Sequence, residues 1–167
     1  NRTLAAPILK ERNIPATVFV ATGYLNGGRM FNDTIIEVVR RAGSELDLTE
    51  LDLGRFELSD DDSRRNAIQA LLGALKYRSP SERIALADQV AAKVGAELPS
   101  DLMMSDAQVR ELTSFGISVG AHTVNHPILN SVAETTARRE IVESRRILRE
   151  MTGDSISLFA YPNGRPK

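Results

Sequence analysis

Two short apolar runs rich in β-branched residues are the clearest pattern along the chain. They span residues 17–21 and 117–121, and a glycine or a Thr-Gly pair stands beside each of them. An apolar run without polar alternation is typical of a strand buried on both faces of a sheet. A third run, Ile156–Tyr161, leads into a Pro-Asn-Gly turn and is predicted to be another strand.

Helical periodicity separates these strands. Apolar side chains recur at intervals of three and four residues, as in helices that pack one face on a core. The predicted helices cover residues 3–12, about 32–41, 63–77, 83–94, 105–115 and 134–151. A solvated face is expected for six charged residues of the last helix, namely Arg138, Arg139, Glu140, Glu143, Arg145 and Arg146. Helix and strand alternate after residue 102, so the sequence predicts an α/β fold with parallel strands, either an open sheet or a (β/α) barrel.

The region from about residue 30 to residue 102 has a different pattern. Residues 45–58 alternate between apolar and polar, which predicts a two-stranded β-ribbon turning near Asp52–Gly54. The two helices after it have apolar stripes that suit an antiparallel pair. Three aspartates at residues 60–62 start the first of these helices, where capping is favoured over metal binding. We expect a variable, mostly helical insertion within one domain spanning residues 1–167.

Composition narrows the functions open to the chain. Its 167 residues suffice for one domain with a sizeable core, and a net charge of −1 gives no electrostatic basis for binding nucleic acid. The absence of cysteine excludes disulfides, thiolate catalysis and Cys-ligated zinc. No run reaches the roughly 18 apolar residues of a transmembrane helix. The chain begins without methionine and ends just after the turn at residues 162–164, so we expect a piece of a longer protein.

The candidate chemistry lies directly after the second apolar run. The two histidines of the chain, His122 and His126, stand there four residues apart. Pro127 disfavours helical backbone at His126, so a turn is expected. Two neutral imidazoles on one side of such a turn can share a divalent cation, although a catalytic zinc usually has three protein ligands. The alternative is a pair of unrelated loop histidines.

Three strings, in this order along the chain, resemble the polysaccharide deacetylases, which are carbohydrate esterase family 4 or the nodulation-protein homology domain. They are PATVFVATG at residues 15–23, SVGAHTVNHP at residues 118–127 and FAYPNG at residues 159–164. The resemblance implies a distorted (β/α) barrel, partial in this chain. It also implies a divalent metal, Zn²⁺ by preference, held by His122 and His126. The third ligand would be an aspartate of a T-F-D-D motif that this sequence does not contain.

By the same resemblance, the family's third motif aligns with residues 160–163. Pro162 matches that motif, whereas Ala160 replaces an arginine that orients the catalytic base. Asn163 is then the main-chain oxyanion donor, and Pro162 and Gly164 belong to a turn that contacts the substrate. The base, the carboxylate ligand and a histidine general acid belong to motifs absent from this sequence. The chain alone is therefore expected to bind metal weakly and to turn over little substrate.

The implied activity is metal-dependent removal of acetyl groups from N-acetylated sugars of peptidoglycan or chitin-like polymers, or from O-acetylated xylan. On N-acetylated sugars the hydrolysed bond is a carbon–nitrogen bond other than a peptide bond. The expected partner is an acetylated polysaccharide or oligosaccharide, without nucleic acid and without a transmembrane segment in this chain. One alternative is a non-catalytic carbohydrate-binding or scaffold barrel of the same fold. The other is an unrelated α/β protein with a fortuitous histidine pair.

Overall fold

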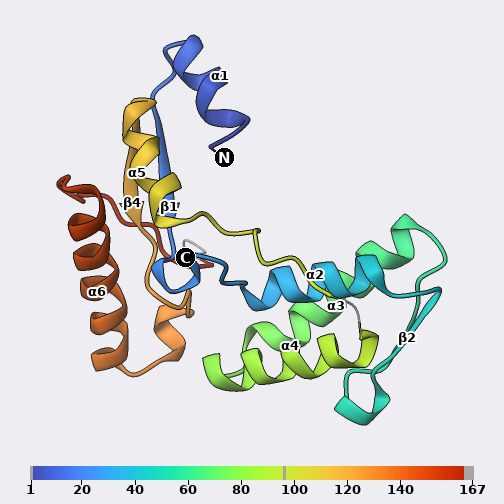
Figure 1. The fold of residues 1–167 in the computed structure, drawn as a ribbon. Coiled ribbons are helices and arrows are strands. Elements are labelled where there is room, and N and C mark those ends of the chain that lie inside the picture. Colours follow the sequence, from blue (N-terminus) through green and yellow to red (C-terminus); the bar gives the residue numbers. More distant parts are fainter. Residues whose placement is uncertain (1, 96, 164–167) are drawn as a thin grey trace. The chain divides into compact units, whose positions relative to one another are not determined.

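Two parallel strands form the sheet that leads to the histidine pair. In the computed structural model, which describes residues 2–95 and 97–163, β1 (Ala16–Val20) pairs with β4 (Ile117–Ala121) along its whole length. The strands lie side by side and end at the same edge of the sheet (Figure 1). Both predicted strands are confirmed, the first with a shift of one residue. Their β-branched side chains favour this structure because they pack well on a pleated surface.

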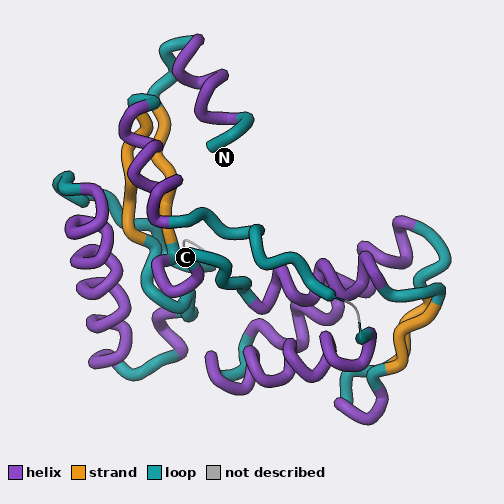
Figure 2. Tube along the Cα trace, in the orientation of Figure 1, coloured by secondary structure: helices purple, strands orange, loops and turns teal. Residues whose placement is uncertain are grey.

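The third predicted strand, Ile156–Tyr161, is wrong as a strand. It forms a single parallel bridge, between Phe159 and Ala121. The carbonyl of Ile156 accepts a hydrogen bond of 2.9 Å from Nε of Arg145. The start of this segment is therefore bonded to a helical side chain and not to a neighbouring strand. In the described part of the chain, the parallel sheet has two strands and no barrel is closed. The observed fold is mixed α/β and mostly helical (Figure 2).

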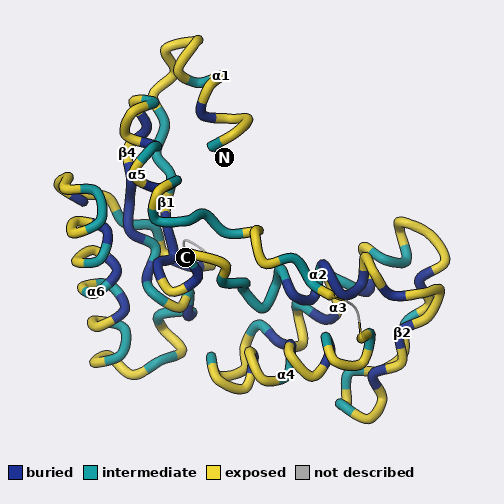
Figure 3. The backbone as a smooth tube through the Cα atoms, in the orientation of Figure 1, coloured by how far each residue is buried: buried dark blue, intermediate teal, exposed yellow. Residues whose placement is uncertain are grey.

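Three helices complete the unit that contains this sheet: α1 (Ala5–Glu11), α5 (Asp106–Ser114) and α6 (Glu134–Thr152). Helices α5 and α6 pack against β4 and against each other. Figure 3 shows that α6 is buried along one side and exposed along the other. The buried core of this unit consists of Ala6, Val20, Val109, Leu112, Ile117, Val119, Ala121, Leu148 and Ile156. Among the described helices, none combines the length and the apolar character needed to cross a membrane.

A second compact unit is formed by residues 29–102, whereas residues 1–28 and 103–167 form the first. Strands β2 (Glu45–Asp47) and β3 (Arg55–Glu57) pair antiparallel, and Asp52 and Gly54 between them have a positive φ, so the predicted ribbon and its turn are confirmed. The elements of this unit are α2 (Phe31–Arg41), β2 (Glu45–Asp47), a 3₁₀ turn (Thr49–Leu51), β3 (Arg55–Glu57), α3 (Asp61–Lys76) and α4 (Pro80–Val94). Its own buried core includes Ile35, Val38, Val39, Leu48, Leu58, Leu71, Leu75 and Val90.

The chain leaves the first unit and re-enters it at neighbouring points. The main-chain N–H of Asn26 donates to the carbonyl of Met104 at 3.1 Å. The side-chain amide of Asn26 donates to the carboxylate of Asp106 at 2.8 Å, and its oxygen accepts the N–H of Asp106 at 3.0 Å. These three bonds close the first unit on itself on either side of residues 29–102.

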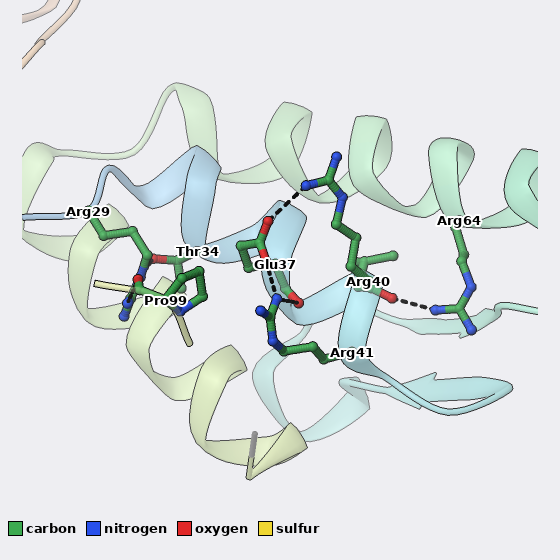
Figure 4. A network of polar contacts seen from close by, with 8 residues as sticks. Arg29, Thr34, Glu37, Arg40, Arg41, Arg64 and Pro99 are labelled. Atoms are coloured by element: carbon green, nitrogen blue, oxygen red, sulfur yellow. Dashed lines mark hydrogen bonds and ion pairs between the residues drawn. The ribbon is translucent and has the colours of Figure 1, made fainter. Parts of the chain in front are cut away.

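Charged side chains hold the C-terminal end of α2 in the second unit (Figure 4). The guanidinium of Arg64 donates to the main-chain carbonyl of Val39, and to those of Ala42 and Gly43 at 3.1 and 3.0 Å. The last carbonyls of a helix lack intrahelical partners, so a cation that donates several hydrogen bonds there stabilises the helix end.

Glu37, on the same helix, is buried beside two arginines (Figure 4). Burial by itself raises the pKa of its carboxyl, whereas hydrogen bonds from Arg41 and Arg40 lower it, and the net direction of the pKa is down. The side chain is therefore a carboxylate at neutral pH, and its charge is balanced by these two guanidinium groups.

Replacing Arg64 by alanine is expected to lower the free energy of unfolding by about 1–2 kcal/mol, because partly buried carbonyls lose a charged donor. Arg65→Ala is the matched control. The guanidinium of Arg65 is exposed and pairs with Asp62 on the same helix, so about 0.5 kcal/mol or less should be lost. Urea unfolding followed by far-UV circular dichroism measures both changes. Equal midpoints for the two variants would show that Arg64 does not stabilise the helix end.

Candidate metal centre

The loop at residues 122–127 leaves the end of β4 and is held by main-chain hydrogen bonds that extend the pairing of the two strands. The N–H of Thr22 donates to the carbonyl of Thr123 at 3.2 Å, and the N–H of Gly23 donates to that of Val124 at 2.9 Å. Glycine allows this approach, because a Cβ at residue 23 would lie 2.8 Å from the same carbonyl oxygen. The loop is thus fixed at the carboxyl end of parallel strands, where ligand sites form in α/β folds.

Two residues of this loop adopt the left-handed backbone conformation that residues other than glycine seldom adopt. Their φ angles are 66° at Thr123 and 53° at His126. Thr123 is fully buried, and its hydroxyl oxygen accepts the main-chain N–H of His126 at 3.0 Å. This bond closes a tight turn between the two histidines, so the turn predicted there is confirmed.

The turn brings the two imidazole rings face to edge. The Nε2 atoms of His122 and His126 lie 2.9 Å apart, with ring centroids separated by 4.6 Å and ring planes inclined by 69°. Nδ1 of His122 lies 2.8 Å from the carbonyl oxygen of Ala160. A carbonyl can only accept, so this Nδ1 carries the proton and leaves the lone pair of His122 on Nε2, toward His126.

The geometry of this pair suits two ligands of one cation. Two nitrogens, each about 2.0–2.1 Å from a tetrahedral zinc, are about 3.3 Å apart, so the observed 2.9 Å requires only a small opening. A ligating histidine usually donates its other ring N–H to a carbonyl or carboxylate, as His122 does to Ala160. Among the residues that the structure describes, no group of three or more histidine, aspartate or glutamate side chains gathers here. The described chain therefore brings two imidazole nitrogens together here, without a third side chain of these kinds.

The segment after residue 159 reaches the histidine pair through Ala160, whose carbonyl holds His122. Pro162 is buried, and Asn163 is exposed with a positive φ of 52° in the turn that follows. Gly164 lies outside the described residues. The oxyanion role of Asn163 and the substrate contacts of Pro162 and Gly164 stay predictions.

Glu140 is a residue whose surroundings the sequence analysis missed. Its charge predicts a position on the solvated face of the last helix, but only 5% of its surface is exposed. Its carboxylate accepts the N–H groups of Val124 and Asn125, in the middle of the histidine loop, at 2.8 Å each. A signal was present, because Glu140 precedes the buried Ser144 and Leu148 at intervals of four residues and so shares the inner face of α6.

Comparison with known proteins confirms the resemblance to the polysaccharide deacetylases. Residues 57–167, which are most of the chain and include the histidine loop, match the family described as Polysaccharide deacetylase. A relative from Bacillus subtilis (strain 168), named "Putative polysaccharide deacetylase YxkH", is 25% identical over 72 residues. That match covers 43% of this chain and 26% of the relative, so the chain spans about a quarter of its length. No solved structure matches. The chain belongs to the polysaccharide deacetylase family.

Proposed function

We propose that His122 and His126 are two ligands of a divalent metal, zinc by preference, in a hydrolase that removes acetyl groups from N-acetylated or O-acetylated polysaccharide. One observation carries the proposal: the two Nε2 atoms face each other at 2.9 Å, with the proton of His122 held on the opposite nitrogen. An uncharged imidazole with an unshared pair on Nε2 is the form that binds zinc.

The residues of this chain have separate tasks in the proposed reaction. A divalent cation held at such a site would polarise the acetyl carbonyl and lower the pKa of water. His122 and His126 would hold the cation, and the carbonyl of Ala160, which accepts from Nδ1 of His122, would keep that ring in its ligating tautomer. The main-chain N–H of Asn163 is proposed as a donor to the developing oxyanion, which such donors stabilise strongly when they are fixed in advance. Pro162 and Gly164 are proposed to border the bound sugar.

The remaining parts of the site are proposed to come from the full protein. The resemblance assigns the carboxylate ligand, the base and the general acid to motifs that this sequence does not contain. We also propose that β1 and β4 belong to the family's distorted (β/α) barrel, with residues from about 30 to 102 as a variable insertion into one catalytic domain. This chain alone is then expected to release little acetate.

The full-length protein is expected to release acetate from an acetylated chitooligosaccharide, and this chain alone much less. Chelation of the metal should reduce release to background, and added Zn²⁺ should restore it, because the hydrolytic water depends on the cation. Coupled enzymatic detection of acetate, with acetylated xylan as a second substrate, measures both effects. Release that continues unchanged after complete removal of metal would contradict the proposal.

A second candidate is a carbohydrate-binding or scaffold barrel without catalysis. It is favoured by Ala160, which stands where the resemblance expects the arginine that orients the base. The same assay separates the two functions, because this candidate binds the oligosaccharide and releases no acetate.

A further inference from the structure

Glu140 is a buried carboxylate near the middle of α6, and a charge in this position is costly unless hydrogen bonds compensate it. Its Oε2 accepts the main-chain N–H groups of Val124 and Asn125, both at 2.8 Å. Its Oε1 accepts the side-chain amide of Asn125, also at 2.8 Å. These three bonds go to two adjacent loop residues, and within the described residues no ion pair of Glu140 with a basic side chain occurs.

These bonds fix the part of the loop that separates the two histidines. Asn125 is also held from the other side, because the hydroxyl of Tyr24 donates to its carbonyl at 3.0 Å. The next residue, His126, has a left-handed backbone, which persists only where its surroundings enforce it. A shift of the main chain at residues 124 and 125 would therefore move the ring of His126 relative to that of His122.

We propose that Glu140 is a positioning residue that sets the separation of the two imidazoles and so tunes the affinity for the metal. This inference rests on the proposed metal site. Both oxygens of Glu140 act as acceptors, and only a carboxylate supplies two acceptor atoms at this place. Glutamine has one oxygen and one NH₂ group, so with the side-chain amide of Asn125 oriented as observed it leaves two donors facing each other on one side. Aspartate keeps the charge but is shorter by one methylene.

The test compares Glu140→Gln, Glu140→Asp and Glu140→Ala with wild type and with Glu150→Gln. Glu150 lies on the same helix, is exposed and pairs with Arg146, which makes it a matched control. The chain has two histidines, so NMR of the imidazole nitrogens in the metal-free protein reports on the pair directly. The amide signals of Val124 and Asn125 report on their hydrogen bonds to Glu140, and calorimetric titration with Zn²⁺ gives the affinity for the metal. All spectra are taken below the unfolding temperature of the least stable variant.

In the three Glu140 variants, the amide protons of Val124 and Asn125 are expected to lose the downfield chemical shift and the protection from hydrogen exchange that their hydrogen bonds to Glu140 give. The NMR signals of both imidazoles are expected to shift. Their dissociation constants for Zn²⁺ should rise by about 10–100-fold, the usual cost of losing a group that orients a ligand. Glu150→Gln should match wild type in every readout. A merely stabilising Glu140 would lower the melting temperature and leave the imidazole signals and the zinc affinity of the folded variants unchanged.

Imidazole signals unaltered in folded Glu140→Gln and Glu140→Ala would overturn the inference. The metal-free spectra keep this outcome distinct from failure of the proposed function. If wild type binds Zn²⁺ no better than His122→Ala does, the metal site is wrong. Whether Glu140 positions the two rings is then still decided by the imidazole and amide signals.

Discussion

Replacing His126 by alanine is expected to weaken Zn²⁺ binding by about a hundredfold, to the level of non-specific binding. Loss of a group that only orients a ligand already costs about 10–100-fold, so loss of one of two proposed ligands costs at least as much. His122→Ala should give the same loss, because its Nε2 lies 2.9 Å from that of His126. Calorimetric titration of the metal-free chain measures the effect.

Ser118→Ala is the control for this experiment. Ser118 is exposed on β4, the strand that leads to His122, so its replacement leaves the loop in place. Folding of each variant is checked by far-UV circular dichroism. If His126→Ala binds Zn²⁺ as tightly as wild type and Ser118→Ala do, the two histidines do not share a cation.

Replacing Leu148 by alanine is expected to lower the free energy of unfolding of the first unit by about 2–5 kcal/mol. Leu148 has no exposed surface and lies in the core formed with Val109, Leu112 and Val119. Truncation leaves a cavity beneath the strand that leads to His122. A native domain is stable by only about 5–15 kcal/mol, so this loss is a large fraction of the total.

Val142→Ala is the matched control, since Val142 lies on the same helix with 58% of its surface exposed. Its replacement should change the free energy of unfolding by about 0.5 kcal/mol or less. Urea unfolding, followed through the amide NMR signals of β4, reports on the stability of the unit that contains the histidine pair. Equal midpoints for the two variants would show that Leu148 does not belong to a close-packed core.

Local patterns were sufficient to predict the strands that carry the site. The strand Ile117–Ala121 was predicted at the bounds observed, because a β-branched run beginning after Gly116 leaves little ambiguity. The segment Ile156–Tyr161 is also mostly apolar and also begins with Ile-Ser, yet it makes only one bridge. Its main chain is bonded in part to α6, and sequence patterns carry little information about such competition between distant groups.

The proximity of the two histidines was predicted from their spacing, whereas the groups that hold them and their loop in place were not. The carbonyl that holds His122 belongs to Ala160, 38 residues later, and a main-chain group has no sequence signature. The charge of Glu140 predicts a solvated side chain, whereas its position on α6 indicates a buried one. Its interval of four residues from Ser144 and of eight from Leu148 would have placed it on the buried face.

The three hydrogen bonds that join Asn26 to Met104 and Asp106 hold the first unit together independently of the length of the segment between them. Residues 29–102 form a unit of their own, and the chain segments on either side of it are hydrogen-bonded to each other within the unit that contains the two histidines. Replacing residues 29–102 by a longer or shorter segment is expected to leave intact the hydrogen bonds that shape the loop at residues 122–127, because these bonds join residues of the first unit. Such a replacement is therefore expected to leave the separation of the two imidazoles unaltered.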